Sequence, residues 1–449
     1  MAAWATTTNS IPSINPATGD VVSYFDKTPP TLLPQLIASS RAAQASWAKV
    51  SLGERCARLR SLRDRMLASR NELADAVVLE SGKPRAEALF ADIFVALDTV
   101  EYFFKNGEKL LQSERVPHHS TAARAKSGHL SYEPLGVVGI ISSWNYPLAI
   151  PLSQIIPAIT AGNSVVSKPS DFTPRCGALI ERLFLDAGFP KSLVTVVQGG
   201  GEVGQALIDA SPDKIMFTGS VSTGRRVAEA CATKLIPTVL ELGGKDAMLV
   251  LSDANLEIAS SAALWGSFTN CGQVCLSVER LFVEKSIADK FTGLCVEKTR
   301  KLRLGPGNDP ATDVGPLIRP QHVQRMTELL SDAVSRGATV LCGGISRPDL
   351  GPNFFEPTVI TGVDSSMKLF QDETFGPILA VQVVKDAKEA VARANNSQFA
   401  LSASVWSENK NRGLSIASEL RAGSVMINDA ISCFAIAEAP HGEIGRAHV

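Results

Sequence analysis

The sequence predicts an α/β protein with a Rossmann-like dinucleotide-binding domain and a second α/β domain. Between residues 134 and 251, short apolar runs alternate with stretches of helical periodicity, which is the pattern of βαβ units around a parallel sheet. The alternation begins again after residue 251. The chain has 449 residues, more than one ordinary domain, and this length favours two large domains.

Composition and charge indicate an ordinary globular chain. Hydrophobic residues make up 45% of it, and the net charge of −1 gives no electrostatic reason to expect nucleic acid or a membrane as a partner. The eight Cys are too dispersed for a disulfide framework, and none pairs with His at zinc-like spacing, so no metal is expected. Because the N-terminus lacks a basic region followed by an apolar core, we expect a cytoplasmic protein. The uncharged run 134–167 contains Asn145, Gln154 and several prolines, which would be costly in lipid.

Residues 31–113 are predicted to be helical. Leu52-Gly53-Glu54-Arg55 opens one helix, and Pro84 stands where a first-turn proline is tolerated, ahead of apolar residues at helical spacing up to Val100. We expect this layer to serve packing and to carry little chemistry. Residues 114–133 are polar without a clear period, as in a surface loop.

Strands are predicted in both alternating regions. In the first they are expected at 136–141, 164–166, 193–197, 214–217, 238–240 and 248–251. In the second they are expected near 280–283, 378–384, 402–406 and 424–427, with helices such as 320–336 and 386–395 between them. Ligands of such parallel sheets bind beyond the carboxyl ends of the strands.

One cysteine stands where catalysis is possible. An apolar, helix-like run ends in Asn270 and Gly272, and Cys275 follows where the chain turns towards a strand beginning near Val278. A thiol at such a turn can face a cleft and act as a nucleophile. A small buried hydrophobe is the alternative. Upstream, Glu241 is a carboxylate at a predicted strand end, followed by two glycines.

Together, Glu241-Leu242-Gly243-Gly244-Lys245 and Phe268-x-Asn270-x-Gly272-Gln273-x-Cys275 resemble the active-site signature of the aldehyde dehydrogenase superfamily, NAD(P)-dependent and hydrolytic. The resemblance runs from Asn15-Pro16-Ala17-Thr18-Gly19 to Pro440-His441-Gly442. It implies an aldehyde substrate and a homodimer or homotetramer. It also implies a NAD-binding domain of residues 1–115 and 134–245, a catalytic domain of 246–431, an oligomerisation arm at 116–133 and a shortened C-terminal segment at 432–449.

The resemblance assigns the cofactor site. Phe217-Thr218-Gly219-Ser220 is a strand end and helix start, where backbone N–H groups attract pyrophosphate. Lys168 is expected at the adenosine ribose, and Asp171 stands where a carboxylate accepts from the 2′-hydroxyl and repels a 2′-phosphate. We therefore predict NAD in preference to NADP, with NADP possible. Glu373 is expected at the nicotinamide ribose and Phe375 beside the ring. The full set is Trp144, Lys168, Asp171, Gly219, Ser220, Gly224, Leu242, Glu373 and Phe375.

The resemblance also assigns the chemistry. Cys275 attacks the aldehyde carbonyl, and a thioester remains on its sulfur after hydride transfer. The side-chain amide of Asn145 and the backbone N–H of Cys275 stabilise the oxyanion. Glu241 is the general base for hydrolysis and distinguishes hydrolytic members from CoA-acylating ones. For Asn145 a helix N-cap is the alternative, and for Glu241 a structural carboxylate.

Substrate contacts are less clearly encoded. Tyr146, Ile150 and Ser153 share one face by helical spacing and, by resemblance, line the tunnel. Val274, Leu276 and Phe434 would flank the thiol. This apolar lining without an evident Arg favours an aliphatic or aromatic aldehyde over succinate semialdehyde, although ordinary helix core would look the same. Cys271 is either a small packing residue or a redox partner of Cys275.

The C-terminus departs from the family. Members usually continue after Pro-x-Gly-Gly with a strand that joins a neighbouring subunit's sheet, whereas this chain ends at Val449. We expect exposed apolar surface and an unpaired sheet edge. This difference keeps open a truncated inactive homologue with a structural or binding role. A CoA-acylating semialdehyde dehydrogenase is a separate alternative.

Overall fold

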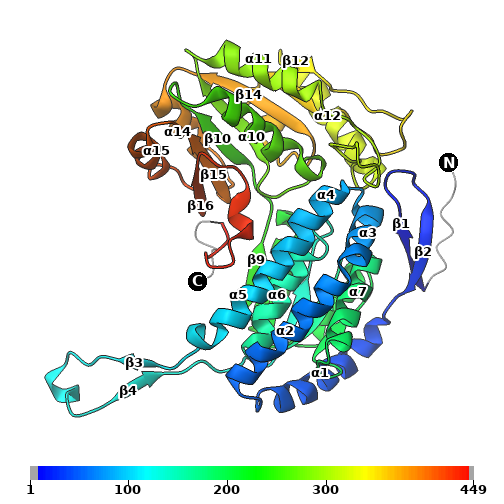
Figure 1. Ribbon diagram of the computed structural model, residues 1–449, viewed down its shortest axis with the longest axis vertical. Coiled ribbons are helices and arrows are strands. Elements are labelled where there is room, and N and C mark those ends of the chain that lie inside the picture. The colour runs from blue at the N-terminus through cyan, green and yellow to red at the C-terminus, as the bar shows by residue number, and fades with distance from the viewer. Residues whose placement is uncertain (1–8, 444–449) are drawn as a thin grey trace.

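The computed structural model describes residues 9–443 and has the predicted α/β class, with two sheets that are each covered by helices (Figure 1). The first sheet contains five strands and the second contains seven. In Figure 1 the second sheet and its helices lie above the first, and the chain passes between the two parts after β9. The candidate site lies at this junction.

The first sheet has the strand order β7-β6-β5-β8-β9, and all neighbouring strands are parallel. Its central strand is β5, whose side chains alternate between the two faces of the sheet. Val137 and Ile141 pack against one layer of helices, while Val138 and Ile140 pack against the other. Because β6 and β8 flank β5 on opposite sides, the strand order reverses there, and a crevice opens at its carboxyl end. The strands are β5 Val137–Ile141, β6 Ser164–Lys168, β7 Val194–Val196, β8 Lys214–Thr218 and β9 Thr238–Glu241.

Helices cover both faces of this sheet. Residues of α2, α5, α6 and α7 build the larger core, while α1, α8 and α9 build the smaller one on the other face. The helical segments are η1 Pro30–Leu32, α1 Leu33–Trp47, α2 Leu52–Ala68, α3 Arg70–Ser81, α4 Arg85–Glu87, η2 Ala88–Phe94, α5 Val95–Leu110, α6 Ala149–Thr160, α7 Pro174–Asp186, α8 Gly201–Asp209 and α9 Val221–Ala232.

The second sheet has the order β12-β13-β14-β11-β10-β15-β16 and is parallel except for β12. Its strands are β10 Asp246–Val250, β11 Val278–Glu284, β12 Thr339–Cys342, β13 Thr358–Thr361, β14 Ile378–Val384, β15 Ser402–Trp406 and β16 Ser424–Ile427. Its helical segments are α10 Leu256–Phe268, η4 Thr269–Gly272, α11 Ala288–Thr299, α12 Pro320–Ser335, α13 Lys368–Gln371, α14 Ala387–Asn395, α15 Lys410–Ala417 and η5 Ser432–Ala435.

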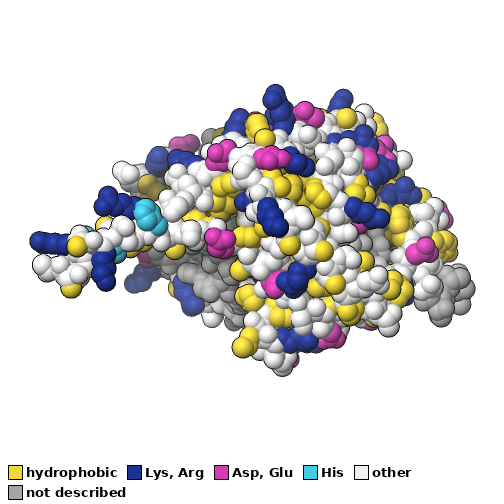
Figure 2. Space-filling view, turned by 90° about the horizontal axis from the view of Figure 1, so that it is seen from below, with side chains coloured by type: hydrophobic (Ala, Val, Ile, Leu, Met, Phe, Trp, Pro, Cys, Tyr) yellow, Lys and Arg dark blue, Asp and Glu magenta, His cyan; other side chains and the backbone are white. Residues whose placement is uncertain are grey.

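Two hairpins lie outside the main sheets. The first joins β1 Ser10–Ile14 and β2 Val21–Asp26 beside α3 and α7. The second joins β3 Glu114–Val116 and β4 Gly128–Leu130, encloses η3 Thr121–Ala123, and projects far from the body as an arm (Figure 1). Lys, Arg and His side chains gather along this arm in Figure 2. The polar segment 114–133 thus forms a projecting arm and not a loop that lies on the surface.

The predicted strands are present, but one belongs to a different sheet than expected and several further strands were not predicted. The apolar pattern grouped the strand at 248–251 with the first alternating region, but β10 lies near the middle of the second sheet. The strands β12 and β13 and the hairpin of β1 and β2 were not predicted, because they are short and lack a clear period. Residues 444–449 of the predicted C-terminal segment lie outside the described residues. Across residues 9–443, no helix combines the length and the apolar character needed to cross a membrane.

Candidate active site

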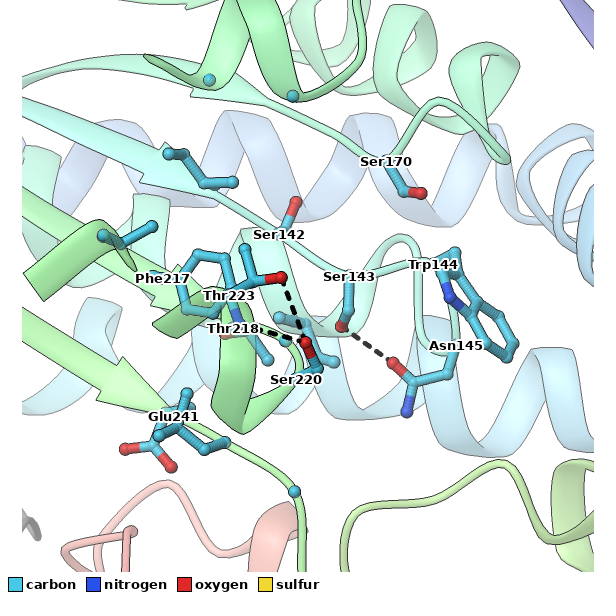
Figure 3. Close-up of a pocket in the computed structure, with 18 of the residues that line it drawn as sticks. Ser142, Ser143, Trp144, Asn145, Ser170, Phe217, Thr218, Ser220, Thr223 and Glu241 are labelled. Carbon is cyan, nitrogen blue, oxygen red and sulfur yellow. Dashed lines mark hydrogen bonds between the residues drawn. The ribbon is translucent and has the colours of Figure 1, made fainter. Parts of the chain in front are cut away.

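A cavity of about 610 Å³ lies at the carboxyl ends of β5, β6, β8 and β9 and is closed on its other side by loops of the second sheet. Figure 3 shows the first-sheet side, where Ser143 and Asn145 follow β5, Ser220 follows β8 and Glu241 ends β9. The residues that line the cavity range from Ile141 to Phe375, so the structure brings together groups up to 234 residues apart in the sequence. The predicted residues that line the cavity are Trp144, Asn145, Ile150, Lys168, Asp171, Gly219, Ser220, Glu241, Leu242, Cys275, Glu373 and Phe375.

Six predicted residues do not line this cavity. Tyr146, Val274 and Leu276 are buried in an apolar cluster against which Cys275 and Phe434 pack, so they lie around the thiol. Gly224 instead lets α9 approach the first sheet, because a Cβ there would lie 2.5 Å from the Leu242 side chain. Ser153 is the exception: it is exposed on α6 and donates to the carbonyl of Ile150, so the structure does not bring it to the site. The helical spacing was counted from Tyr146, but α6 begins only at Ala149, so Tyr146 is not on the same helix as Ile150 and Ser153.

A left-handed turn presents the cysteine. After α10, the residues Asn270, Cys271 and Gly272 all have positive φ angles of 50°, 56° and 71°, which reverses the chain. Gly272 is required there, since a Cβ would overlap the backbone of Gly376. Seven residues after the end of α10 at Phe268, the loop reaches Cys275. The carbonyl of Cys275 lies so close to Gly244 that no Cβ would fit there. The strand end that carries Glu241 and the cysteine loop are thereby locked together.

Asn145 is held by its neighbours with its amide towards the cysteine loop. Its Oδ1 accepts from Ser143 Oγ at 2.8 Å (Figure 3), and its Nδ2 donates to the carbonyl of Gln273 at 3.0 Å. The alternative of a helix cap does not describe this geometry, because α6 begins at Ala149 and Leu148 occupies its N-cap position. One N–H of the amide remains for another acceptor.

The charges around Cys275 are mostly negative. Burial raises the pKa of this thiol well above its usual range, and the nearby carboxylates of Asp246, Glu373 and Glu241 raise it further. The sulfur is therefore held as a thiol at neutral pH. Burial also raises the pKa of Glu373 to about 7, with Glu279 adding to the shift, while the N–H of Gly244 donates to Glu373 Oε1 at 3.2 Å.

The other end of the cavity has the features of a dinucleotide site. The N-terminus of the 12-residue helix α9 faces it, with Ser220 as the N-cap that accepts from the N–H of Thr223 at 3.3 Å. Lys168 is buried and donates to the carbonyls of Pro169 and Gly199 at 2.8 and 3.0 Å, and burial lowers its pKa. A helix N-terminus, an ammonium group and a carboxylate at Glu373 match the phosphates and ribose hydroxyls of a dinucleotide.

Sequence reasoning missed part of the wall. The start of α12 crosses the cavity and contributes Arg319, His322 and Arg325. His322 packs 5.4 Å from the Trp144 ring, and burial together with the two arginines lowers its pKa to about 4, so it is neutral at pH 7. The helix itself was predicted at 320–336, but no local pattern indicates which of its turns meets a distant cavity. Arg226, Ser170 and Gln205 line the cavity as well.

The two cysteines of the motif pack in different places. Cys271 is buried in the main core of the second sheet, where burial raises its pKa well above the usual range. Cys275 packs instead against the cluster that contains Tyr146 and Leu276. This separation favours the interpretation of Cys271 as a packing residue over that of a redox partner. In the part of the chain that the structure describes, no three His, Cys, Asp or Glu side chains are grouped so that they could hold a metal ion.

Comparisons with known proteins show which family this chain resembles in sequence and in fold. The model of the aldehyde dehydrogenase family matches residues 4–446. A Mycolicibacterium smegmatis protein, provisionally named succinate-semialdehyde dehydrogenase (NADP+), is 40% identical over 417 residues, or 92% of this chain and 80% of that protein. The 4,4′-diapolycopene aldehyde oxidase of Methylomonas sp. is 36% identical over 98% of this chain and 83% of its own. The NAD+ complex of an aldehyde dehydrogenase from Bacillus cereus superposes with a TM-score of 0.91 at 32% identity, covering 96% of this chain and 87% of that one.

Proposed function

The chain belongs to the aldehyde dehydrogenase family, and we propose that it oxidises an aldehyde to a free carboxylic acid through a thioester on Cys275, with NAD(P) as the hydride acceptor. The observation that carries the proposal is the convergence of Cys275, Asn145 and Glu241 on one cavity that also contains Glu373. A nucleophile, an oxyanion donor, a general base and a dinucleotide contact in one site are what this reaction requires.

In the first half of the reaction, the Cys275 thiol releases its proton to water, and the sulfur adds to the aldehyde carbon. The carbonyl oxygen becomes an oxyanion that accepts from the free N–H of Asn145 and from the backbone N–H of Cys275. Lys168, Ser220 and Glu373 would hold the dinucleotide, which would supply the hydride acceptor for this carbon. Because the Asn145 amide is already fixed by Ser143 and Gln273, little reorganisation is needed when the charge develops.

In the second half, Glu241 activates a water that attacks the thioester carbonyl. The carboxylate takes one proton from the water, the C–S bond breaks, and the acid leaves with the sulfur restored as a thiol. Glu241 lies at the end of β9 on the wall of the same cavity, which supports this role over that of a purely structural carboxylate. It also favours hydrolysis over transfer to CoA.

We further propose NAD as the preferred cofactor. Asp171 is exposed at the rim of the cavity, close enough to Lys168 to raise the pKa of that ammonium, and its negative charge would repel a 2′-phosphate. The residues at this end fit a dinucleotide of either kind: Lys168 and Ser170 offer donors, and α9 offers its N-terminus. Relatives are named for both cofactors, so the preference rests on the charge of Asp171.

For the substrate we propose an apolar aldehyde. The side chains packed around the Cys275 thiol are apolar or aromatic, and the rings of Tyr146 and Phe434 lie 5.7 Å apart beside it. A second carboxylate on the substrate would lose its hydration there, and the carboxylates of Asp246, Glu373 and Glu241 near the thiol would repel it. We therefore propose the same type of reaction as that named for the Mycolicibacterium smegmatis relative, but not succinate semialdehyde as the substrate.

The test is the formation of NADH or NADPH, followed by absorbance, with aliphatic, aromatic and dicarboxylic semialdehydes, each with and without CoA. We expect turnover without CoA and the highest kcat/KM for an apolar aldehyde with NAD. The variant Glu241→Gln should keep a pre-steady-state burst of NADH while steady-state turnover collapses, because only thioester hydrolysis is removed. Unimpaired turnover in this variant would refute the role of Glu241, and activity that requires CoA would favour the acylating alternative.

A further inference from the structure

Three charged side chains are buried behind the reacting groups, in the helical layer for which only packing was expected. Lys83, Glu87 and Asp92 are 1%, 8% and 0% exposed. Glu87 ends α4, and Asp92 belongs to η2, a π-helical stretch of seven residues between α4 and α5. Charged residues are rarely buried without specific partners, and π-helical turns often mark functional sites. The partners of these three residues lie next to the oxyanion donor.

Lys83 and Asp92 fix the backbone around Asn145. Lys83 Nζ donates to Asp92 Oδ2 at 2.8 Å and to the carbonyl of Asn145 at 2.7 Å, and it lies 4.0 Å from the centre of the Tyr146 ring. Asp92 Oδ1 accepts from the N–H groups of Leu148 and Ala149, both at 3.1 Å, and so satisfies the start of α6. The carbonyl of Asn145 and the helix that follows it are thus held from the rear.

Glu87 holds the other side of the site, the left-handed turn before Cys275. Its Oε2 accepts from the backbone N–H of Asn270 at 2.8 Å. Asn270 has a φ of 50°, a conformation that a non-glycine residue keeps only when its surroundings fix it. The Nδ2 of Asn270 then donates to two carbonyls, that of Asn145 at 3.0 Å and that of Gln273 at 3.2 Å. The Gln273 carbonyl is also the acceptor that orients the Asn145 amide.

We propose that Glu87 is a positioning residue for this active site: by anchoring Asn270, it sets the position of the Asn145 amide relative to Cys275. The inference rests on the proposed function, since Asn145 is taken as the oxyanion donor. Glu87 is not among the residues that line the cavity. It accepts from the N–H of Asn270 and from the side chain of the adjacent Thr269, and the Asn270 amide then donates to the two carbonyls. A displacement of about 1 Å at a reacting group can lower a rate by about 10²-fold.

The test compares Glu87→Leu, which removes the acceptor, with Glu87→Gln, which keeps an oxygen acceptor in the same volume. The measurement is the rate of the NADH burst in single turnover, normalised to the burst amplitude so that unfolded protein does not count. We expect the burst rate to fall about 10- to 100-fold in Glu87→Leu and to stay within about 3-fold of wild type in Glu87→Gln. The cofactor dissociation constant, from tryptophan fluorescence, should change less than about 2-fold in both, because no cofactor contact is altered.

Glu80 provides a matched control. It is fully buried on α3, and it accepts from Ser13 Oγ and from the N–H groups of Arg175 and Cys176, away from the reacting groups. Glu80→Leu should destabilise the protein but leave the normalised burst rate unchanged. A wild-type burst rate in Glu87→Leu, an equal loss in Glu80→Leu, or no rescue in Glu87→Gln would overturn the proposal.

If Glu87→Leu does not fold, Asn270→Gly tests the same connection, because glycine adopts the positive φ freely and keeps the backbone N–H. It removes both side-chain bonds to the carbonyls of Asn145 and Gln273, so the burst rate should again fall, and an unchanged rate would refute the connection. Crystal structures of the variants give a readout without activity: the Asn145 amide should turn away from the Gln273 carbonyl in Glu87→Leu and not in Glu87→Gln. Wild-type protein without any burst would count against the proposed function, whereas an unmoved Asn145 amide would count against Glu87.

Discussion

The buried carboxyl of Glu87 should make the stability of this protein depend on pH, and the substitution Glu87→Gln measures the effect. Burial raises the pKa of Glu87 from 4.5 to about 7, and its hydrogen bond from Asn270 and the charge of Lys83 offset only part of the shift. The raised pKa means that the folded state binds the proton more tightly than the unfolded state. The stabilising contribution of the protonated form is complete below pH 4.5 and is lost as the pH rises through about 7.

The size of the effect follows from the shift. Each pKa unit corresponds to 1.36 kcal/mol, so ionising Glu87 in the folded state removes about 3 kcal/mol between pH 5 and pH 8. Glutamine carries no such titration, and its own packing and hydrogen-bond differences are the same at both pH values. With an unfolding entropy of roughly 2.1 cal/mol/K per residue, a chain of 449 residues converts this difference into about 3 °C.

The assay is calorimetric unfolding of the wild type and of Glu87→Gln at pH 5 and pH 8. We expect the difference in melting temperature, variant minus wild type, to be about 3 °C larger at pH 8 than at pH 5. Glu328→Gln, on the exposed face of α12, is the control for replacing a carboxyl group by an amide outside the core. A difference in melting temperature that is equal at the two pH values, or larger at pH 5, would refute the reasoning.

Three other substitutions test other parts of the structure. Asp171→Asn should raise the ratio of kcat/KM for NADP to that for NAD by about 10-fold, because the charge that repels a 2′-phosphate is gone; an unchanged ratio would remove the basis of the NAD preference. Cys271→Ala should leave the loss of activity in peroxide unchanged, because this thiol packs in the second-sheet core and not beside Cys275; protection by the substitution would restore the redox interpretation. Lys83→Met should lower the free energy of unfolding by about 3–5 kcal/mol, measured by denaturant titration, because Asp92 is left buried and unpaired; a loss below about 1 kcal/mol would show that the pair is replaceable.

The sequence was sufficient for the fold class and for most of the cavity, because both depend on local patterns. β5 reads as a buried strand from five consecutive apolar or glycine residues, and a residue just after a parallel strand must lie at the ligand-binding edge. That argument brings Asn145, Lys168 and Glu241 to one side without any knowledge of packing. The same argument does not extend to Ser153, because the helical spacing was counted from Tyr146, whereas α6 begins only at Ala149.

The residues that sequence reasoning missed have in common that their role is set by distant contacts. Glu87 lies 183 residues before its partner Asn270, and Lys83 lies 62 residues before Asn145. In the sequence, charged residues at helical spacing are typical of a solvated helix face, and the π-helical turn that moves Asp92 inward leaves no recognisable local pattern. His322 on α12 was missed for the same reason.

The rate of the reaction should depend on how three separate parts of the chain fit together. Asn145 extends from the first sheet, Cys275 belongs to a loop of the second, and Glu87 comes from the helical layer that precedes both. Neither sheet alone can fix the distance from the amide to the sulfur, since each carries only one of the two groups. The hydrogen bonds from Asn270 to Asn145 and from Asn270 to Glu87 are the links that join all three parts. A substitution that loosens the contact between the sheets should therefore slow the attack of the thiol even when every reacting group is present, and it should do so through the same amide that Glu87 positions.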